Sequence, residues 1–315
     1  MIATLAGGVG GARFLDGLVQ ANGAENVTAV VNTADDFELF GLRICPDLDT
    51  VLYTLAGLAN PVLGWGIADD TRATLDGIAA FGEEPWFLLG DRDFATHILR
   101  TSWMREGALL SEVTDQFRRR LSVSTPVIPM TNDRVGTTIE TPGGWIDFQD
   151  YFVRRRQQDD VIGVSFVGIE EAHPTPAALE AVQRAEMIVL APSNPIVSIG
   201  PILAIDEFHR AISDRTAPAI AISPLIGGKA LKGPADKMME TLGHESTAVG
   251  VARLYEGLID GFVIDHVDAE QAAEIEELGI AVLVTDAIMH DIADRGRLAR
   301  EVVAFGESLH VKATA

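Results

Sequence analysis

The sequence predicts an α/β protein built on a Rossmann-like, mostly parallel sheet with helices on both faces, together with a helical and β-hairpin cap region. The first observation is a set of short, nearly continuous apolar runs, which are typical of strands buried on both faces. The runs occupy residues 2–6, 27–32, 161–167, 187–192, 219–223, 262–267 and 281–286. The second observation is that longer helical patterns separate these runs. The third is size, because 315 residues that are 47% hydrophobic suffice for one large α/β domain or two modest ones.

Helices are predicted from the spacing of apolar residues between the strands. The segment 91–107 illustrates this, because Phe94, Ile98 and Met104 recur at helical intervals behind Asp91, a suitable N-cap residue. The predicted helices cover residues 12–21, 48–58, 69–81, 91–107, 111–121 and 289–304. The stretch from about 50 to 121 is mostly helical, so it is expected to form a cap on the sheet.

The cap is expected to span residues 51–155, between core segments 1–50 and 156–315; one continuous domain is the alternative. Two extended runs flank Pro142-Gly143-Gly144, which is a β-hairpin signal. The charge run at 154–160 is interpreted as a solvated loop, after which α/β alternation resumes.

The charge balance excludes two classes of partner. Acidic residues outnumber basic ones 46 to 24, for a formal net charge of −22. Such a surface repels nucleic acid and anionic membranes. A small anionic ligand would need a local site made of backbone N–H groups, a few cationic side chains or a metal.

Cys45 is the one cysteine, so no disulfide can form within the chain, which suits the cytoplasm. We interpret it as a small buried hydrophobe rather than a nucleophile. The first residues reach glycine too early for a signal peptide, and no apolar run approaches the ~18 residues of a membrane helix. We therefore expect a cytoplasmic protein, and we expect a homodimer.

The opening stretch LAGGVGGARF is the first candidate site. Gly8, Gly10 and Gly11 lie where a strand turns into a helix, and Arg13 follows them. Glycines let a backbone approach a phosphate and direct N–H groups at it, and the helix N-terminus adds positive potential. Neither the dinucleotide fingerprint nor the Gly-Lys-Ser/Thr phosphate loop is matched. A tight turn for helix–sheet packing, with Arg13 in a surface ion pair, is the alternative.

Four aspartates follow the second predicted strand, at the edge where such sheets bind ligands. They are Asp35, Asp36, Asp47 and Asp49. Carboxylates of this kind suit Mg²⁺ that is shared with phosphate oxygens. The alternative is that Asp35 and Asp49 cap helices and the others are solvated.

A second acidic pair, Asp91 and Asp93, precedes a predicted helix, where capping is again the alternative.

Two later loops also follow predicted strands. Ser193, Asn194 and Ser198 form a polar stretch between prolines, suited to a base or ribose. The second loop is rich in glycine and lysine, with a solvated loop as its alternative. Its candidate residues are Gly227, Gly228, Lys229 and Lys232.

The histidines show no metal-ligand spacing, and His97 and His290 are interpreted as structural. Two phosphate-type loops and an aspartate cluster together indicate metal-assisted chemistry on a nucleotide diphosphate. The residues themselves carry the interpretation no further.

Six ordered segments resemble the 2-phospho-L-lactate transferase (CofD/FbiA) family of coenzyme F-420 biosynthesis. The resemblance covers roughly residues 1–255, and the last 60 residues match only in pattern. The segments are GGVGGARFL, DDFELFGLRICPDLDTVLYTLAG, GWGIADDT, GDRDFATHILRT, LAPSNPIVSIGPIL and ISPLIGGKALKGPADKM.

The resemblance implies a Mg²⁺-dependent reaction on two substrates. The donor would be a guanosine diphosphate diester carrying a lactyl, enolpyruvyl or similar three-carbon acid. The terminal ribityl hydroxyl of the deazaflavin FO would attack the phosphorus nearer that acid. GMP would leave, and coenzyme F-420-0 or its dehydro form would result.

The resemblance also implies roles for the candidate residues. Gly8, Gly10, Gly11 and Arg13 would hold the diphosphate, and Asp35, Asp36 and Asp49 would hold Mg²⁺. Asp49, Asp36 and Arg13 would serve the reaction most directly. Guanosine and its phosphate would contact Ser193, Asn194, Ser198, Gly227, Gly228, Lys229 and Lys232. FO would lie near Asp91, Asp93, Trp65 and Trp86, although core packing is the alternative for both tryptophans and the favoured one for Trp86.

Two rival functions remain at this point. One is a non-catalytic nucleotide- or nucleotide-sugar-binding regulator of a sister family, whose members would be expected to lack the combined DLDT and GDRD segments. The other is a nicotinamide oxidoreductase, which the missing third glycine of the fingerprint disfavours.

Overall fold

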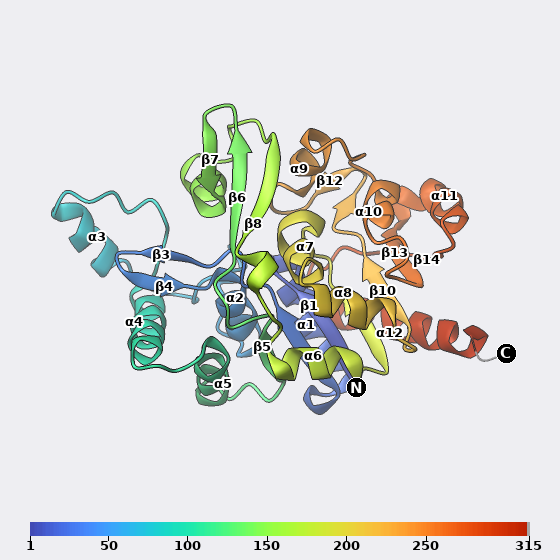
Figure 1. The fold of residues 1–315 in the computed structure, drawn as a ribbon. Helices are drawn as coiled ribbons and strands as arrows, with labels where there is room; N and C mark the ends of the chain where they lie inside the picture. Colours follow the sequence, from blue (N-terminus) through green and yellow to red (C-terminus); the bar gives the residue numbers. More distant parts are fainter. Residues whose placement is uncertain (314–315) are drawn as a thin grey trace.

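The computed structural model describes residues 1–313 and is built around a sheet of seven parallel strands (Figure 1). The strand order is β14-β13-β10-β9-β1-β2-β5. The bounds are Ile2–Ala6 (β1), Val27–Val31 (β2), Val127–Pro129 (β5), Met187–Leu190 (β9), Ala219–Ile222 (β10), Gly261–Asp265 (β13) and Ala281–Thr285 (β14). From β1 the chain builds outward through β2 to β5, then returns to β9 and builds the other way. The crevice at the carboxyl ends of β1 and β9 is therefore the topological switch point, where sheets of this kind bind ligands.

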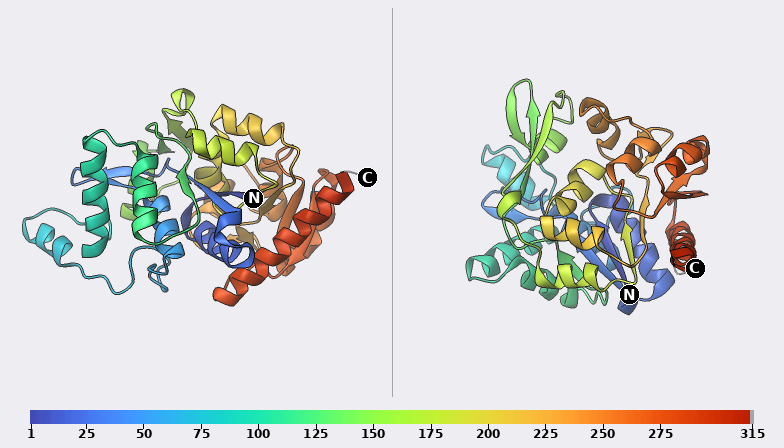
Figure 2. Two further views of the ribbon diagram at one scale, coloured as in Figure 1. Left: turned by 90° about the horizontal axis from the view of Figure 1, so that it is seen from below. Right: turned by 45° about the vertical axis from the view of Figure 1, so that its right-hand side comes forward.

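Helices cover both faces of the sheet, as predicted. One face is covered by α1 (Gly8–Asn22), α2 (Pro46–Leu55), α5 (Leu110–Arg120) and α12 (Ile292–Ala313). The other is covered by α6 (Pro176–Gln183), α7 (Gly200–Leu203), α8 (Asp206–Ser213), α10 (Ala248–Leu254) and α11 (Ala272–Glu277). Strand β2 supplies both layers, because Val30 packs into one and Ala29 and Val31 into the other. Figure 2 shows α1 and α12 side by side on their face.

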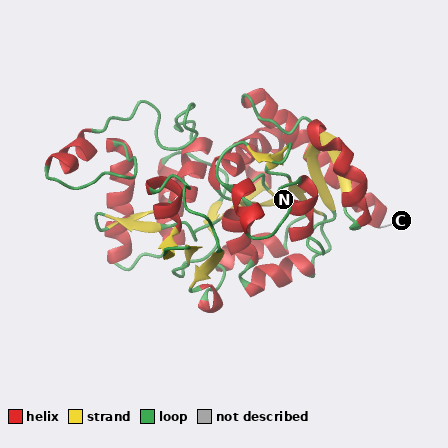
Figure 3. Cartoon of the chain, turned by 90° about the horizontal axis from the view of Figure 1, so that it is seen from above, coloured by secondary structure: helices red, strands yellow, loops and turns green. Residues whose placement is uncertain are grey.

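The elements outside the main sheet form two groups, which include residues 37–44 and 163–167 in addition to parts of the expected cap segment 51–155. The hairpin β3 (Phe37–Leu39) and β4 (Leu42–Ile44) lies with α3 (Ala73–Ala80) and α4 (Asp91–Arg105) on one side of the main sheet, at the left of Figure 1. A separate antiparallel sheet has the order β7-β6-β8, with bounds Gly144–Asp147, Gly136–Thr141 and Gly163–Val167. Strands β6 and β7 are the predicted hairpin. Figure 3 shows that helices and loops surround the strands.

Two strands differ from the prediction. The expectation that 161–167 belongs to the parallel sheet is wrong, since β8 pairs antiparallel with β6. Its side chains alternate between partly buried and exposed, so it is not buried on both faces. The edge position beside β2 is filled instead by β5, a three-residue strand too short to give a pattern. Strand β5 lies in the expected cap segment but joins the main sheet, and β8 lies in the expected core segment but joins the separate antiparallel sheet.

The predicted helices exist, with shifted ends. Helix α1 begins at Gly8 instead of residue 12, and α2 begins at Pro46 instead of residue 48. Helix α12 extends beyond the predicted residue 304. None of the described helices combines the length and the apolar content that crossing a membrane requires.

Candidate active site

A cavity of about 760 Å³ opens at the carboxyl edge of the sheet. The loops that follow β1, β2, β9, β10 and β14 line it, together with side chains from α2, α4 and the cap. The predicted site residues that line it are Gly8, Gly10, Arg13, Asp35, Asp49, Trp65, Asp93, Ser193, Asn194, Ser198 and Lys232. The predicted site residues that do not line it are Gly11, Asp36, Asp91, Gly227, Gly228 and Lys229. The structure thus joins segments far apart in the sequence.

The glycine loop has the packing role that was considered as the alternative for it. Gly8 has a φ of +65°, and its N–H donates to Asp47 Oδ1 at 2.8 Å on the cavity wall. A Cβ at Gly10 would lie 2.4 Å from the Pro192 carbonyl oxygen, and one at Gly11 would lie 2.5 Å from Ser193 Oγ. Gly10 and Gly11 therefore let α1 pack against the loop after β9. The placement of Gly11 in a phosphate cradle is corrected to this packing role.

Arg13 and Lys232 bring uncompensated positive charge to the cavity. Among the described residues, Arg13 has neither an ion-pair nor a hydrogen-bond partner, and Lys232 Nζ donates only to the Leu63 carbonyl at 2.7 Å. Burial lowers the pKa of both, and the charge of Arg13 further lowers that of Lys232. Two cations that lack carboxylate partners among the described residues, in a chain of net charge −22, suit an anionic ligand.

The turn at 227–229 does not line the cavity, which corrects its predicted contact with the nucleotide. Gly227 and Gly228 have φ values of +58° and +74°, as the tight turn between short strands requires. The N–H of Gly227 donates to the Asp268 carboxylate, and Lys229 pairs with Asp236 at 3.5 Å. Of the four residues predicted in this loop, Lys232 is the one that lines the cavity.

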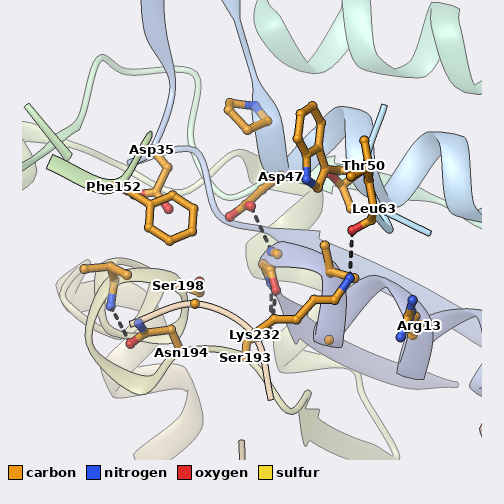
Figure 4. Close-up of a pocket in the computed structure, with 18 of the residues that line it drawn as sticks. Arg13, Asp35, Asp47, Thr50, Leu63, Phe152, Ser193, Asn194, Ser198 and Lys232 are labelled. Carbon is orange, nitrogen blue, oxygen red and sulfur yellow. Dashed lines mark hydrogen bonds between the residues drawn. The ribbon is translucent and has the colours of Figure 1, made fainter. Parts of the chain in front are cut away.

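Asp35 and Asp47 are buried on the cavity wall, and no cationic side chain of the described residues pairs with either of them. Asp47 accepts hydrogen bonds from Gly8 N and from Asn32 Nδ2 at 3.0 Å, whereas Asp35 Oδ1 has no hydrogen-bond partner. Burial and the charge of Asp47 raise the pKa of Asp35 well above its ordinary value. Burial raises the pKa of Asp47 to about 6. Figure 4 shows both carboxylates on the same side of the cavity, above Ser198. Two adjacent buried carboxylates and an unpartnered oxygen fit a divalent cation.

Asp36 and Asp49, both predicted metal ligands, are instead paired with arginines. Asp36 Oδ2 accepts from Arg43 at 3.1 Å and does not line the cavity. Burial raises the pKa of Asp36 to about 6, although Arg43 opposes this. Both oxygens of Asp49 accept from the Arg100 guanidinium, with Nη1 at 3.0 Å from Oδ2. Asp49 also does not cap α2, because the N-cap residue is Cys45 and the first turn already contains Asp49.

Helix α4 adds a second buried polar cluster behind Asp49. Tyr53 OH donates to Asp93 Oδ1 at 2.7 Å, and His97 Nε2 lies 3.3 Å from the same oxygen. Although burial opposes it, the hydrogen bonds from His97 and Tyr53 lower the pKa of Asp93. Ligand atoms of Asp49, Asp93 and His97 lie within 4.8 Å of one another, a grouping that can hold a metal, but Arg100 disfavours a cation there.

His97, Tyr53 and Arg100 are residues that sequence reasoning missed. A signal for His97 was available, because Asp93 and His97 are four apart on one helix and so share a face. The sequence places Asp47 in the acidic cluster, but Asp47 is not among the predicted metal ligands. Its signal was its position in the first turn of α2, beside the glycine loop.

Contrary to the prediction, Asp91 does not cap the helix that follows it, because the N-cap residue of α4 is Gly90 and Asp91 is the first residue of that helix; it caps α3 instead. Its carboxylate accepts from the N–H groups of Ala73 and Thr74, which begin α3. Hydrogen bonds from Thr71 and Thr74 hold its pKa well below the ordinary value. Asp91 is therefore corrected from a ligand contact to a residue that fixes the start of α3.

The polar loop after β9 uses most of its side chains to hold its own shape. Asn194 Oδ1 accepts from Ile196 N at 2.9 Å and from Val197 N at 3.3 Å, which caps the π-helical turn Pro195–Ile199. Ser193 Oγ donates to the Gly7 carbonyl and accepts from Gly7 N, which fixes this loop to the glycine loop. Ser198 remains a hydroxyl on the cavity wall (Figure 4).

An aromatic wall closes the cap side of the cavity. The ring centroid of Phe87 lies 6.4 Å from Trp65 and 5.7 Å from Trp86, while Phe148 stacks on Phe152 at 5.4 Å. Trp86 also packs on Phe37, in agreement with its favoured core role, yet it lines the cavity as well. A wall of this kind suits a planar ring system.

Comparison with known proteins identifies the family. Residues 2–303 match the sequence model of the family described as 2-phospho-L-lactate transferase CofD. The chain belongs to this family. It is 44% identical over 314 residues to a phosphoenolpyruvate transferase of Streptomyces griseus, covering 98% of this chain and 99% of the relative. It is 40% identical over 306 residues to the phosphoenolpyruvate transferase of Mycolicibacterium smegmatis, covering 90% and 94%.

These matches confirm the resemblance seen in the sequence, and they make the chain a transferase of the CofD family. A solved structure of an upf0052 family member from Bacillus halodurans superimposes with a TM-score of 0.65 at 16% identity. The match covers 96% of this chain and 98% of that one. At this identity the likeness shows the fold alone, and it agrees with the predicted α/β architecture.

Proposed function

We propose that the protein transfers a phosphorylated three-carbon acid from a guanosine diphosphate diester to the ribityl hydroxyl of the deazaflavin FO. Since the relatives of highest identity given above are named phosphoenolpyruvate transferases, the enolpyruvyl donor is the first choice. The observation that carries the proposal is that one cavity combines an anion site, an uncompensated carboxylate pair and an aromatic wall. This combination suits a donor with phosphates, a divalent metal and a flat acceptor.

The donor diphosphate would lie over the glycine loop. The N-terminus of α1 offers backbone N–H groups there, and Arg13 adds a guanidinium that is free of other partners. The nucleoside would extend toward the loops after β10 and β14, where Ser223 and the segment 287–290 line the cavity. The donor thereby leaves the aromatic wall open to the acceptor.

Asp35 and Asp47 are our proposed Mg²⁺ ligands. They are adjacent, buried and uncompensated, whereas Asp36 and Asp49 are already neutralised by arginines. When bound, Mg²⁺ would neutralise charge that develops between the attacking and leaving oxygens. The chain itself holds Asp47 in place through Gly8 N and Asn32, close to the loop where the diphosphate would lie.

FO would stack on the aromatic wall, with Trp65 as the first contact. Its ribityl chain would then run along Asp93 toward the glycine loop, since both line the same cavity. The attacking hydroxyl would lose its proton to water as its oxygen bonds to phosphorus, and GMP would leave with the electrons of the broken P–O bond. The proposed homodimer and cytoplasmic location remain separate proposals.

The test is product analysis with matched donors. The purified chain is incubated with FO, Mg²⁺ and either the enolpyruvyl or the lactyl diester of GDP, and products are identified by mass spectrometry. We expect Mg²⁺-dependent release of GMP together with a phosphodiester of FO, faster with the enolpyruvyl donor. If neither donor gives a phosphodiester of FO, the proposal is wrong; a faster lactyl reaction would change the donor only.

A further inference from the structure

Lys232 is a cation that lines the cavity on the side of Trp65, where FO is proposed to bind, and it has no anionic partner among the described residues. It lies in the loop that precedes α9 (Ala235–Thr241), and its ammonium donates to the Leu63 carbonyl, a neutral acceptor two residues before Trp65. No carboxylate of the described residues pairs with it. Exchange of a neutral carbonyl for a ligand carboxylate would strengthen this hydrogen bond, because charge-assisted bonds are stronger.

The neighbouring turn fixes where this ammonium lies. Gly64 has a φ of +82°, and a Cβ there would lie 2.5 Å from Val9 Cγ1 and 3.2 Å from Lys232 Nζ. Lys232 therefore lies against the turn that rests on the glycine loop, on the side of Trp65. Figure 4 shows the Lys232 side chain in front of the helix that carries Arg13, with its ammonium hydrogen-bonded to Leu63. The transferred acid must occupy this region, between a diphosphate on the glycine loop and an acceptor on the aromatic wall.

The charges of the donor and the cavity can then be matched. The proposed donor carries two phosphate charges and one carboxylate. Arg13 and Lys232 are the arginine and lysine side chains among the described residues that line the cavity. Arg13 belongs to α1, directly after the glycine loop, and Asp35 and Asp47 would bring a metal to the phosphates. The carboxylate is the anionic group left without a partner.

We propose that Lys232 binds the carboxylate of the three-carbon acid and thereby selects diesters that carry one. The inference rests on the proposed function. On binding, the ammonium leaves the Leu63 carbonyl for the carboxylate, with no covalent change. Lys232 is thus a specificity-determining residue, distinct from Arg13, which contacts the diphosphate that all such diesters share.

Two ligands separate the contribution of Lys232 to carboxylate binding from that of Arg13 to diphosphate binding. The first is the lactyl diester of GDP, and the second is the isopropyl diester, in which a methyl group replaces the carboxylate. Both are titrated by calorimetry with Mg²⁺ present into the parent chain, Lys232→Met and Lys232→Arg. We expect the parent to prefer the lactyl diester by roughly 10- to 150-fold, the range for one charge-assisted hydrogen bond. We expect Lys232→Met to abolish that preference while its affinity for the isopropyl diester stays within about threefold.

Two variants serve as controls for the carboxylate contact. Lys232→Arg should keep part of the preference, and Arg13→Ala should weaken both diesters by a similar factor. Equal weakening of both diesters by Lys232→Met would overturn the inference in favour of a phosphate contact. A preference that survives in Lys232→Met and in a second variant, Lys232→Gln, would also overturn it. Failure of the parent to bind either diester would instead overturn the proposed function, and the inference with it.

Discussion

Arg100 donates to both carboxylate oxygens of Asp49, and the two side chains are buried together beside the cavity. The guanidinium also lies 3.1 Å from His97 Nδ1, so one cation organises an acid from α2 and a histidine from α4. The negative charge of Asp49 is therefore neutralised by Arg100 inside the protein. It is a poor candidate for binding a metal, although it lies two residues from Asp47.

Asp49→Asn is expected to unfold more easily and not to change the Mg²⁺ requirement selectively. The substitution leaves Arg100 buried without a counter-charge, which costs about 3–5 kcal/mol of stability. Urea unfolding checks this, with Glu180→Gln as the control, because the exposed pair of Glu180 with Arg184 should contribute less than about 1 kcal/mol. Parent-like stability together with a raised Mg²⁺ requirement would return Asp49 to the metal site.

Asp35→Asn is expected to have the opposite effect on stability. The variant removes one of two adjacent buried charges, so the free energy of unfolding at pH 7 without Mg²⁺ should increase. The rate of group transfer should nevertheless fall by roughly two orders of magnitude or more, as for loss of one transition-state contact. Urea unfolding and a transfer assay measure the two effects. A destabilised variant with normal transfer would show that Asp35 is merely structural.

The pH dependence follows from the same pair. The pKa of Asp47 is raised from 3.8 to about 6, so the folded state binds the proton more tightly than the unfolded state does. This contribution is fully present below pH 3.8 and is lost as pH rises through 6. It corresponds to roughly 3 kcal/mol for a shift of this size. Mg²⁺ should therefore raise the melting temperature more at pH 7.5 than at pH 5. Equal stabilisation at both pH values would contradict the carboxylate pair as the site.

The strands buried on both faces could be predicted from sequence, because unbroken apolar runs such as 187–192 occur almost only there. Strand β5 could not, since three residues carry no periodicity, and β8 was assigned to the wrong sheet because its run is also largely apolar. Pairing partners are decided by topology, which a local pattern does not contain.

The site residues that follow the strands of the sheet could be predicted, because the ends of those strands could be predicted. Loops after parallel strands meet at one edge, which is why Gly8, Asp35, Ser198 and Lys232 could be brought together in advance. The ion pair of Asp49 with Arg100 could not be foreseen, because it joins two helices 51 positions apart in the sequence. Which carboxylates stay uncompensated depends on such long-range pairs, and so the choice of Asp35 and Asp47 as proposed metal ligands rests on the structure.

Arg13→Ala is expected to weaken donor binding more than FO binding. A guanidinium pairs with phosphate oxygens, and FO carries no phosphate. Loss of one charge-assisted hydrogen bond costs about 1.5–3 kcal/mol, or roughly 10- to 150-fold in affinity. Calorimetry with GDP and with FO checks this. Equal weakening of both ligands would assign Arg13 to folding.

Trp65→Ala and Trp86→Ala are expected to separate acceptor binding from packing. Among the described residues, the one aromatic ring that pairs with Trp65 is Phe87, at 6.4 Å between ring centroids, and Trp65 lines the cavity where a flat ligand would stack. Its loss should weaken FO binding by about 1–3 kcal/mol, the usual value for stacking of a base on an aromatic side chain, with little change in melting temperature. Trp86 packs on both Phe37 and Phe87, so its loss should cost roughly 1–3 kcal/mol of stability. FO titration by calorimetry and thermal unfolding of both variants test the pair. If Trp86→Ala weakens FO binding without loss of stability while Trp65→Ala leaves it unchanged, the ring of FO lies against Trp86 and the two roles are exchanged.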